Sequence, residues 1–217
     1  MLADLPETLA VFPLSGVLLL PRGDLPLNIF EPRYLKMVEA ALATPSRLIG
    51  MIQPYNGTDA VGGLHRTGCA GKITQFSETD DGRYLITLRG VCRFNIIEEL
   101  PQQDGFRRVV PKFDLFADDL KGCGGLDLDR VRLVGLLREY FRVEGLSCNW
   151  DKVKDAPDDT LITALSMICP LDPCDKQALL MAADSSARAT LFLKLLEIAI
   201  TRARGDHSPG GHKGGCH

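Results

Sequence analysis

Apolar residues in the first half of the chain follow the short periods of β-strands. Residues 7–20 predict two short extended segments separated by Pro13 and Gly16, and the second is the continuous apolar run at 17–20, typical of a strand buried on both faces. Further strands are predicted at 26–30, 48–52, 70–76, 84–88, 93–97 and 107–116. The first half is therefore expected to be rich in β-structure.

Turn and helix signals divide these strands. Residues 80–82, Asp-Asp-Gly, predict a tight hairpin turn, and Gly90 is expected to interrupt the strand that returns from it. Pro32 suits the first turn of a helix, whose buried face is predicted from apolar positions 35, 38 and 42, and Pro45 ends it. Pro111 favours an edge position or a bulge in the last strand.

The second half of the chain has helical periodicity. We predict a β-rich part at 1–117, a Gly-rich linker at 118–127, a helical part at 128–204 and a disordered tail rich in Gly and His at 205–217. Within the helical part, one helix is predicted at 130–143, and others are expected to start near Asp155, Asp172 and Ser185. Strands followed by helices indicate an α+β fold rather than alternating βαβ units.

Composition narrows the class of protein. The chain has 217 residues, 45% of them hydrophobic and 24% charged, as in ordinary soluble domains, and its net charge of −3 provides no basic footprint for nucleic acid. Seven cysteines, an odd number with irregular spacing, favour a reducing compartment. The N-terminus has no basic region and carries two acids among its first seven residues, unlike a signal peptide, and no apolar run reaches the ~18 residues of a membrane span. We therefore expect a cytoplasmic protein that does not associate with membranes.

Several motifs, in order along the chain, resemble a known family. Residues 12–14 (FPL) and 27–34 (LNIFEPRY) closely resemble the opening of the Lon substrate-binding domain, which precedes the ATPase and peptidase parts of ATP-dependent Lon proteases. The central hairpins are similar at 68–73, 81–86 and 88–94, and the helical part at 158–162 and 175–180. The resemblance covers roughly residues 5–200 and implies a PUA-like β pseudo-barrel with one helix, followed by a C-terminal helical bundle.

The resemblance also implies a role in holding unfolded or partner polypeptides, as a stand-alone adaptor or chaperone-like factor in protein quality control, with a separate ATP-dependent protease as a further expected partner. Open strand edges bind extended chains through main-chain pairing. The apolar candidates for such a site are Phe12, Leu14, Phe30 and Tyr34, although residue by residue an ordinary core position is the commoner role for each. Glu31 and Arg33 flank Pro32 and either pair with each other, cap the helix or meet a substrate.

The chain offers little for catalysis. The Gly-x4-Gly-Lys-Ser/Thr phosphate loop that an ATPase needs is absent from the 217 residues, and a Ser-Lys peptidase domain has no room in this length. A nucleophile activated by histidine would have to use His65, which lies in a Gly-rich loop where solvated histidines are common. We therefore expect no enzymatic activity, whatever a protease family name suggests.

Metal and cofactor sites are not indicated either. Structural zinc sites pair closely spaced ligands in two sets, and Cys169 and Cys174 have no second pair with matching spacing. The tail offers further ligands, namely His207, His212, Cys216 and His217, but short His-rich tracts often bind metal without a physiological role. We expect no cofactor and no metal.

Two other binding functions remain as alternatives. PUA-like folds bind RNA in some families, and a stripe of arginines on the strands suits that role; against it stands the interpretation that these side chains lie on solvated strand faces and pair with Glu98, Glu99 and Asp104. The arginines are Arg83, Arg89, Arg93, Arg107 and Arg108. The net acidity favours the second interpretation. A barrel that holds a small ligand is the other alternative.

Overall fold

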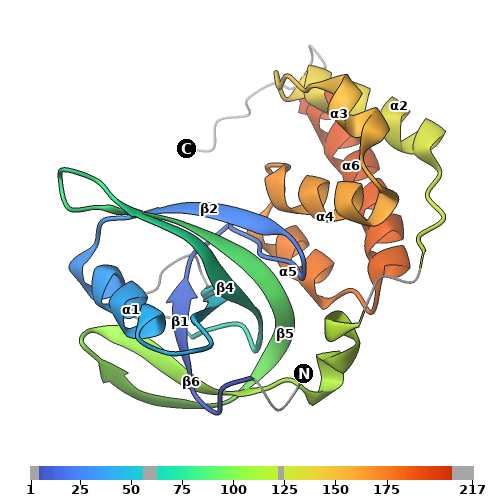
Figure 1. The fold of residues 1–217 in the computed structure, drawn as a ribbon. Coiled ribbons are helices and arrows are strands. Elements are labelled where there is room, and N and C mark those ends of the chain that lie inside the picture. Colours follow the sequence, from blue (N-terminus) through green and yellow to red (C-terminus); the bar gives the residue numbers. More distant parts are fainter. Residues whose placement is uncertain (1–4, 56–62, 122–124, 207–217) are drawn as a thin grey trace, which may run out of the picture.

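Six strands form one mixed sheet that closes into a ring in the computed structural model, which describes residues 5–55, 63–121 and 125–206. The strand order is β2-β5-β4-β3-β1-β6, and β5 also pairs with β6, which completes the ring (Figure 1). The β1–β3 pair is parallel and the other pairs are antiparallel. The strands are β1 (Leu9–Pro13), β2 (Asp24–Ile29), β3 (Leu48–Ile52), β4 (Thr67–Glu78), β5 (Tyr84–Gln103) and β6 (Phe106–Lys112).

The long strand β5 makes this closure possible because it pairs with β4 along its first part and with β6 along its last part, while β2 adds a further strand to its first part. Register shifts between β4 and β5, and again between Ile96 and Glu98, bend the strand, as β-bulges do. Pro111 pairs with Ile96 next to that second shift, so its missing N–H falls at an irregularity, as predicted. The predicted hairpin turn is also confirmed, with Gly82 at φ +78°.

Helices complete the α+β fold that the sequence predicts. The helix α1 (Pro32–Leu42) packs on β1, β3 and β6 and buries Tyr34, Met37, Val38 and Ala41, a face shifted from the predicted one. In the second half, α2, α4 and α5 all pack on α6. None of the described helices combines the length and the apolar character that crossing a bilayer requires. The elements are the 3-10 helix η3 (Asp114–Leu120), α2 (Arg130–Val143), α3 (Trp150–Asp155), α4 (Asp158–Ile168), α5 (Pro173–Met181) and α6 (Ser185–Asp206).

A continuous hydrophobic core joins the ring to the helices. It includes Ile49 and Leu88 from the strands and Leu133 and Phe192 from the helices, all fully buried. The first residues of the predicted linker belong to η3, and α6 continues into the predicted tail as far as Asp206, whereas residues 207–217 lie outside the described part. The division into two parts at 118–127 stays a prediction.

Three local predictions were wrong. Leu18, Leu19 and Leu20 are buried, but residues 17–20 are not a strand. This segment and the turn that follows it pack on β5 instead. In the turn, the Arg22 amide donates to the Gly90 carbonyl at 2.7 Å, and the Gly90 amide donates to the Gly23 carbonyl at 2.8 Å. Gly90 therefore does not interrupt β5; a Cβ there would lie 2.0 Å from the Leu20 carbonyl oxygen, so glycine permits the close approach.

The third wrong prediction is the helix start near Asp155. Asp155 is the last residue of α3, an element that the sequence pattern did not reveal, and α4 begins only at Asp158. Ala156 lies between them with ψ 139°, because the residue before Pro157 is forced out of the helical region.

Candidate functional site

A groove of about 320 Å³ opens where the ends of β1 and β2 meet the start of α1. Its walls are mostly apolar. Main-chain pairing fixes the wall that β1 and the residue after it form, because the Leu14 amide continues the β1–β3 ladder by donating to the Ile52 carbonyl at 3.0 Å. The groove is lined by Phe12, Pro13, Leu14, Ser15, Leu27, Asn28, Ile29, Phe30, Glu31, Tyr34 and Pro54.

The structure places five of the six predicted site residues around this groove, and Arg33 outside its lining. Phe12 and Tyr34 are buried, with ring centroids 4.3 Å apart, so they also serve as core residues. Leu14 is half-buried. Phe30 differs from all of them, because 64% of it is exposed and an ordinary core role is excluded. The binding role of the six stays a prediction.

Glu31 and Arg33 pair with each other, which was one of the three alternatives. The Arg33 Nη2 group lies 2.9 Å from Glu31 Oε2, and its Nε donates to the same oxygen at 3.1 Å. Glu31 occupies the N-cap position of α1, but its side chain makes no capping hydrogen bond. The Arg33 guanidinium also lies 4.6 Å from the centre of the Tyr34 ring, which favours a cation–π contact. The charges at the rim of the groove are therefore balanced.

A second hollow, of about 430 Å³, extends the apolar surface. It lies over β2, β4 and β5 and shares Leu27 and Asn28 with the groove. Phe76 and Leu85 line it, and each is 45% exposed. Among the described strands, β2 pairs only with β5, so its other edge has no strand partner. Exposed apolar side chains thus gather beside an open strand edge, a combination found at interaction sites.

A buried amide pair connects the groove region with the helical part. The Gln53 side chain accepts a hydrogen bond from the Gly16 amide at 3.1 Å and donates to the Pro173 carbonyl and to Gln177 Oε1. Gln177 in turn donates to the Thr67 carbonyl at 3.1 Å. Both glutamines are almost fully buried. Sequence reasoning missed them, because a polar residue at one position carries no signal of a partner more than 100 residues away.

The predicted arginine stripe is not a free basic surface. Arg107 pairs with Glu99 at 2.7 Å, as the second interpretation predicts. The partners of two other arginines differ from those predicted: Arg83 pairs with Asp81 and Arg89 with Asp24, each at 2.8 Å. Arg93 does not lie on a solvated face at all, since only 4% of it is exposed.

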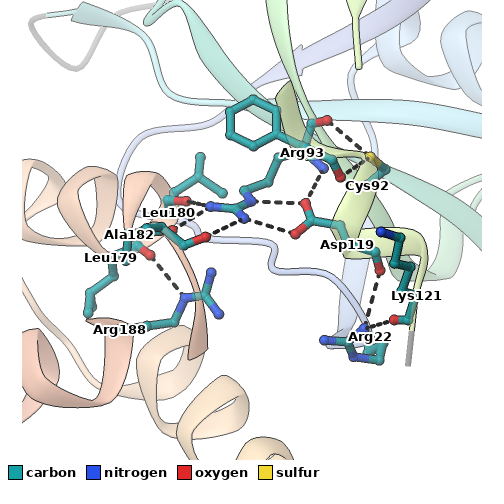
Figure 2. A network of polar contacts seen from close by, with 11 residues as sticks. Arg22, Cys92, Arg93, Asp119, Lys121, Leu179, Leu180, Ala182 and Arg188 are labelled. Atoms are coloured by element: carbon teal, nitrogen blue, oxygen red, sulfur yellow. Dashed lines mark hydrogen bonds and ion pairs between the residues drawn. The ribbon is translucent and has the colours of Figure 1, made fainter. Parts of the chain in front are cut away.

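Arg93 instead connects the ring to the helices (Figure 2). Its Nε and Nη2 groups donate to the two carboxylate oxygens of Asp119 in η3, each at 2.9 Å. The Nη1 group donates to the carbonyls of Leu180 and Ala182, and Nη2 donates to that of Ala183, beyond the end of α5. These carbonyls would otherwise lack donors at a helix end. The short spacing Gly90-x2-Arg93 was visible in the sequence, but its partners were not.

The pKa values of His65 and of two cysteines differ from their ordinary values. His65 packs against Tyr55, with ring centroids 4.2 Å apart, and partial burial lowers the pKa of His65 below its ordinary value. Burial raises the pKa of Cys92 and of Cys169 to about 12, so neither thiol ionises readily. Within the described ranges, no three His, Cys, Asp or Glu residues gather as a metal site would need. The tail histidines lie outside those ranges.

Comparison with known families identifies this architecture. Residues 8–197 match the family model of the ATP-dependent protease La (LON) substrate-binding domain. The chain belongs to this family. This chain is 21% identical over 203 residues to Lon protease 2 of Myxococcus xanthus, and 26% identical over 125 residues to a Lon protease of Syntrophus aciditrophicus. The matches cover 89% and 54% of this chain but only 24% and 16% of those proteases.

Solved structures show the same fold. A Lon N-terminal domain protein from Xanthomonas campestris superposes with a TM-score of 0.62 at 22% identity, covering 86% of this chain and 97% of that one. The N-terminal domain of a Mycobacterium avium complex Lon protease gives a TM-score of 0.56 at 17% identity, covering 89% and 98%. The LON substrate-binding fold therefore accounts for both the ring and the helices.

Proposed function

We propose that this chain binds extended, apolar segments of unfolded polypeptides in the groove beside β2, and that it acts as an adaptor for a separate ATP-dependent protease or as a chaperone-like factor. It holds these polypeptides without cleaving them. Membership of the LON substrate-binding family supports the class of ligand, and exposed Phe30 at the groove supports the place.

The open edge of β2 supplies the main-chain contacts in this proposal. An extended segment that lies along Leu27–Ile29 pairs with backbone groups that β5 does not use, which gives affinity without regard to sequence. Apolar side chains of the ligand then alternate between the groove and the second hollow, which share Leu27 and Asn28. Pro26 on the same strand lacks an N–H, so pairing is limited to the part of β2 that follows it.

Fluorescence anisotropy tests the proposal with the full chain and labelled lactalbumin that has been reduced and carboxymethylated, so that it stays unfolded. Phe30→Ser should weaken binding roughly tenfold or more, as the loss of an exposed aromatic anchor does. Leu115→Ser is the matched control, because Leu115 on η3 is 73% exposed and lines none of the groove. Native lactalbumin should not bind. Equal losses in the two variants, or equal binding of folded and unfolded lactalbumin, would contradict the proposal.

Salt dependence separates this mode of binding from nucleic-acid binding. Affinity that rests on apolar contacts and main-chain pairing should hold between 50 and 200 mM salt, whereas binding of a phosphate backbone by several basic residues falls by roughly a thousandfold or more over that range.

A further inference from the structure

A polar cavity of about 620 Å³, separate from the groove and from the second hollow, lies between the ring and the start of α6. Its walls come from the segment before β2, from η3 and from the first turn of α6, and it shares no lining residue with the groove. Four basic and three acidic side chains line it. The polypeptide groove therefore does not account for this cavity, and its polar lining calls for a different ligand.

Arg188 is the most unusual member of this lining. Only 5% of it is exposed, and its Nε group donates to the Leu179 carbonyl at 3.0 Å. Neither of its two Nη groups bonds any residue in the described ranges, although the side chain lines the cavity. Figure 2 shows the guanidinium on the α6 side of the Arg93–Asp119 pair. Both oxygens of Asp119 already accept hydrogen bonds from Arg93.

A buried guanidinium that is bonded to no carboxylate is costly, because burial removes water from its charge, and the nearby Asp119 carboxylate, which Arg93 already engages, offsets only part of that loss. Burial lowers the pKa of Arg188 to about 10, and the nearby charge of Arg93 acts in the same direction. The group still carries its proton at neutral pH. Its Nη donors are therefore charged, bonded to no described residue and available to an anion in the cavity.

The start of α6 adds two more donors. The Asp184 side chain accepts from the Ala187 amide at 2.8 Å, and the Arg188 amide donates to the Asp184 carbonyl. The amides of Ser185 and Ser186 bond no other described residue, and both residues line the cavity. Free amides at the positive end of a helix of 22 residues attract an anion.

Arg22 contributes a further cation to the cavity. Its Nη1 group donates to the carbonyls of Asp119 and Lys121, at 3.2 and 3.0 Å, and it pairs with no carboxylate in the described chain. Its backbone has φ +67°, a left-handed conformation that is strained for a residue with a side chain and that is often kept at functional positions. Since the basic side chains outnumber the acidic ones by one, the cavity suits a ligand with a single negative charge.

We propose that this cavity binds one carboxylate group, held by the Nη groups of Arg188, by Arg22 and by the first amides of α6. The carboxylate belongs either to a small organic acid or to the C-terminal end of a polypeptide. The fork of an arginine matches the two oxygens of a carboxylate. This site lies apart from the groove and does not depend on the function proposed for it.

Nuclear magnetic resonance of the ¹⁵N-labelled full chain tests the proposal, with acetate as the probe and chloride and phosphate at matched ionic strength as references. Acetate should move the Arg188 Nε–H signal and the Ser185 and Ser186 amides in a saturable way, in roughly the millimolar range expected of so small a ligand. Chloride should not. Two peptides, identical except that one has a free and the other an amidated C-terminus, then identify the source of the carboxylate. If the site responds to the free peptide but not to the amidated one, the ligand is a polypeptide end. If it responds to acetate but to neither peptide, the ligand is a small organic acid.

Ser186→Asp provides the mutational test. An acid in the first turn of a helix favours folding, so the variant should remain folded, while its charge at the cavity should weaken acetate binding roughly tenfold or more. Ser77→Asp on β4 makes the same change of net charge at an exposed position that does not line this cavity, and should leave the affinity within about twofold. Equal shifts with chloride, tighter binding of phosphate than of acetate, or unchanged affinity in Ser186→Asp would each overturn the proposal.

Discussion

Removing the Asp119 carboxylate should destabilise the whole protein, because Asp119 neutralises a buried arginine at the junction between ring and helices. Asp119→Ala deletes three hydrogen bonds: those from Arg93 Nε and Nη2, each 2.9 Å, and that from the Arg93 amide, 3.0 Å. The two side chains are only 5% and 10% exposed, so little water can replace the lost partner. Breaking a buried pair by removing one member typically costs about 3–5 kcal/mol.

Urea unfolding measures this loss. With an m-value of about 2–3 kcal/mol/M, expected for a chain of this size, the midpoint should fall by roughly 1–2.5 M. Trp150, the single tryptophan, reports on the helical part by fluorescence, while far-UV circular dichroism reports on the whole fold. Coincident transitions from the two signals would justify treating the unfolding as two-state.

Asp24→Ala is the matched control for this experiment. Asp24 also pairs with an arginine, Arg89, at 2.8 Å, but the two side chains are 53% and 51% exposed. Pairs of this kind contribute under about 1 kcal/mol. Suppose that Asp119→Ala lowers the free energy of unfolding no more than Asp24→Ala does. Then the Asp119 carboxylate does not hold Arg93 in place, and this buried ion pair contributes no more to stability than an exposed one.

Other predictions concern packing, thiols and activity. Gly90→Ala should lower the free energy of unfolding by about 1–3 kcal/mol, because its Cβ would overlap a backbone carbonyl, whereas Gly135→Ala, in open space within α2, should raise it by roughly 0.5–1 kcal/mol; urea titration of both checks the contrast. At pH 8, exposed Cys174 should react with a disulfide reagent at once and buried Cys92 and Cys169 only after unfolding, as peptide mapping by mass spectrometry will show; fast labelling of the buried thiols would contradict their burial. The pure 217-residue chain should leave casein intact with or without ATP, and an ATP-dependent loss of casein would refute the non-enzymatic assignment.

Local patterns were sufficient for much of the architecture. Alternating apolar positions indicated the β-rich half, the Asp-Asp-Gly turn and Pro32 marked a hairpin and a helix start, and the change to helical spacing after residue 127 indicated the α+β order. These signals depend on interactions between residues that are neighbours in the chain, so they can be seen without a structure. The order of the motifs also indicated the family, which the comparison confirms.

What only the tertiary structure decided is which residues meet across long stretches of chain. The sequence placed Phe12 and Phe30 together as candidates, but only the fold shows that the first is buried and the second exposed. It presented Arg93 as one arginine of a surface stripe, whereas the closure of the ring brings this side chain to Asp119 and to the end of α5. Nothing in the sequence singled out Arg188, which only the tertiary structure shows to be buried beside a cavity. Burial and long-range pairing depend on how the elements pack, and that packing is not encoded in any local pattern.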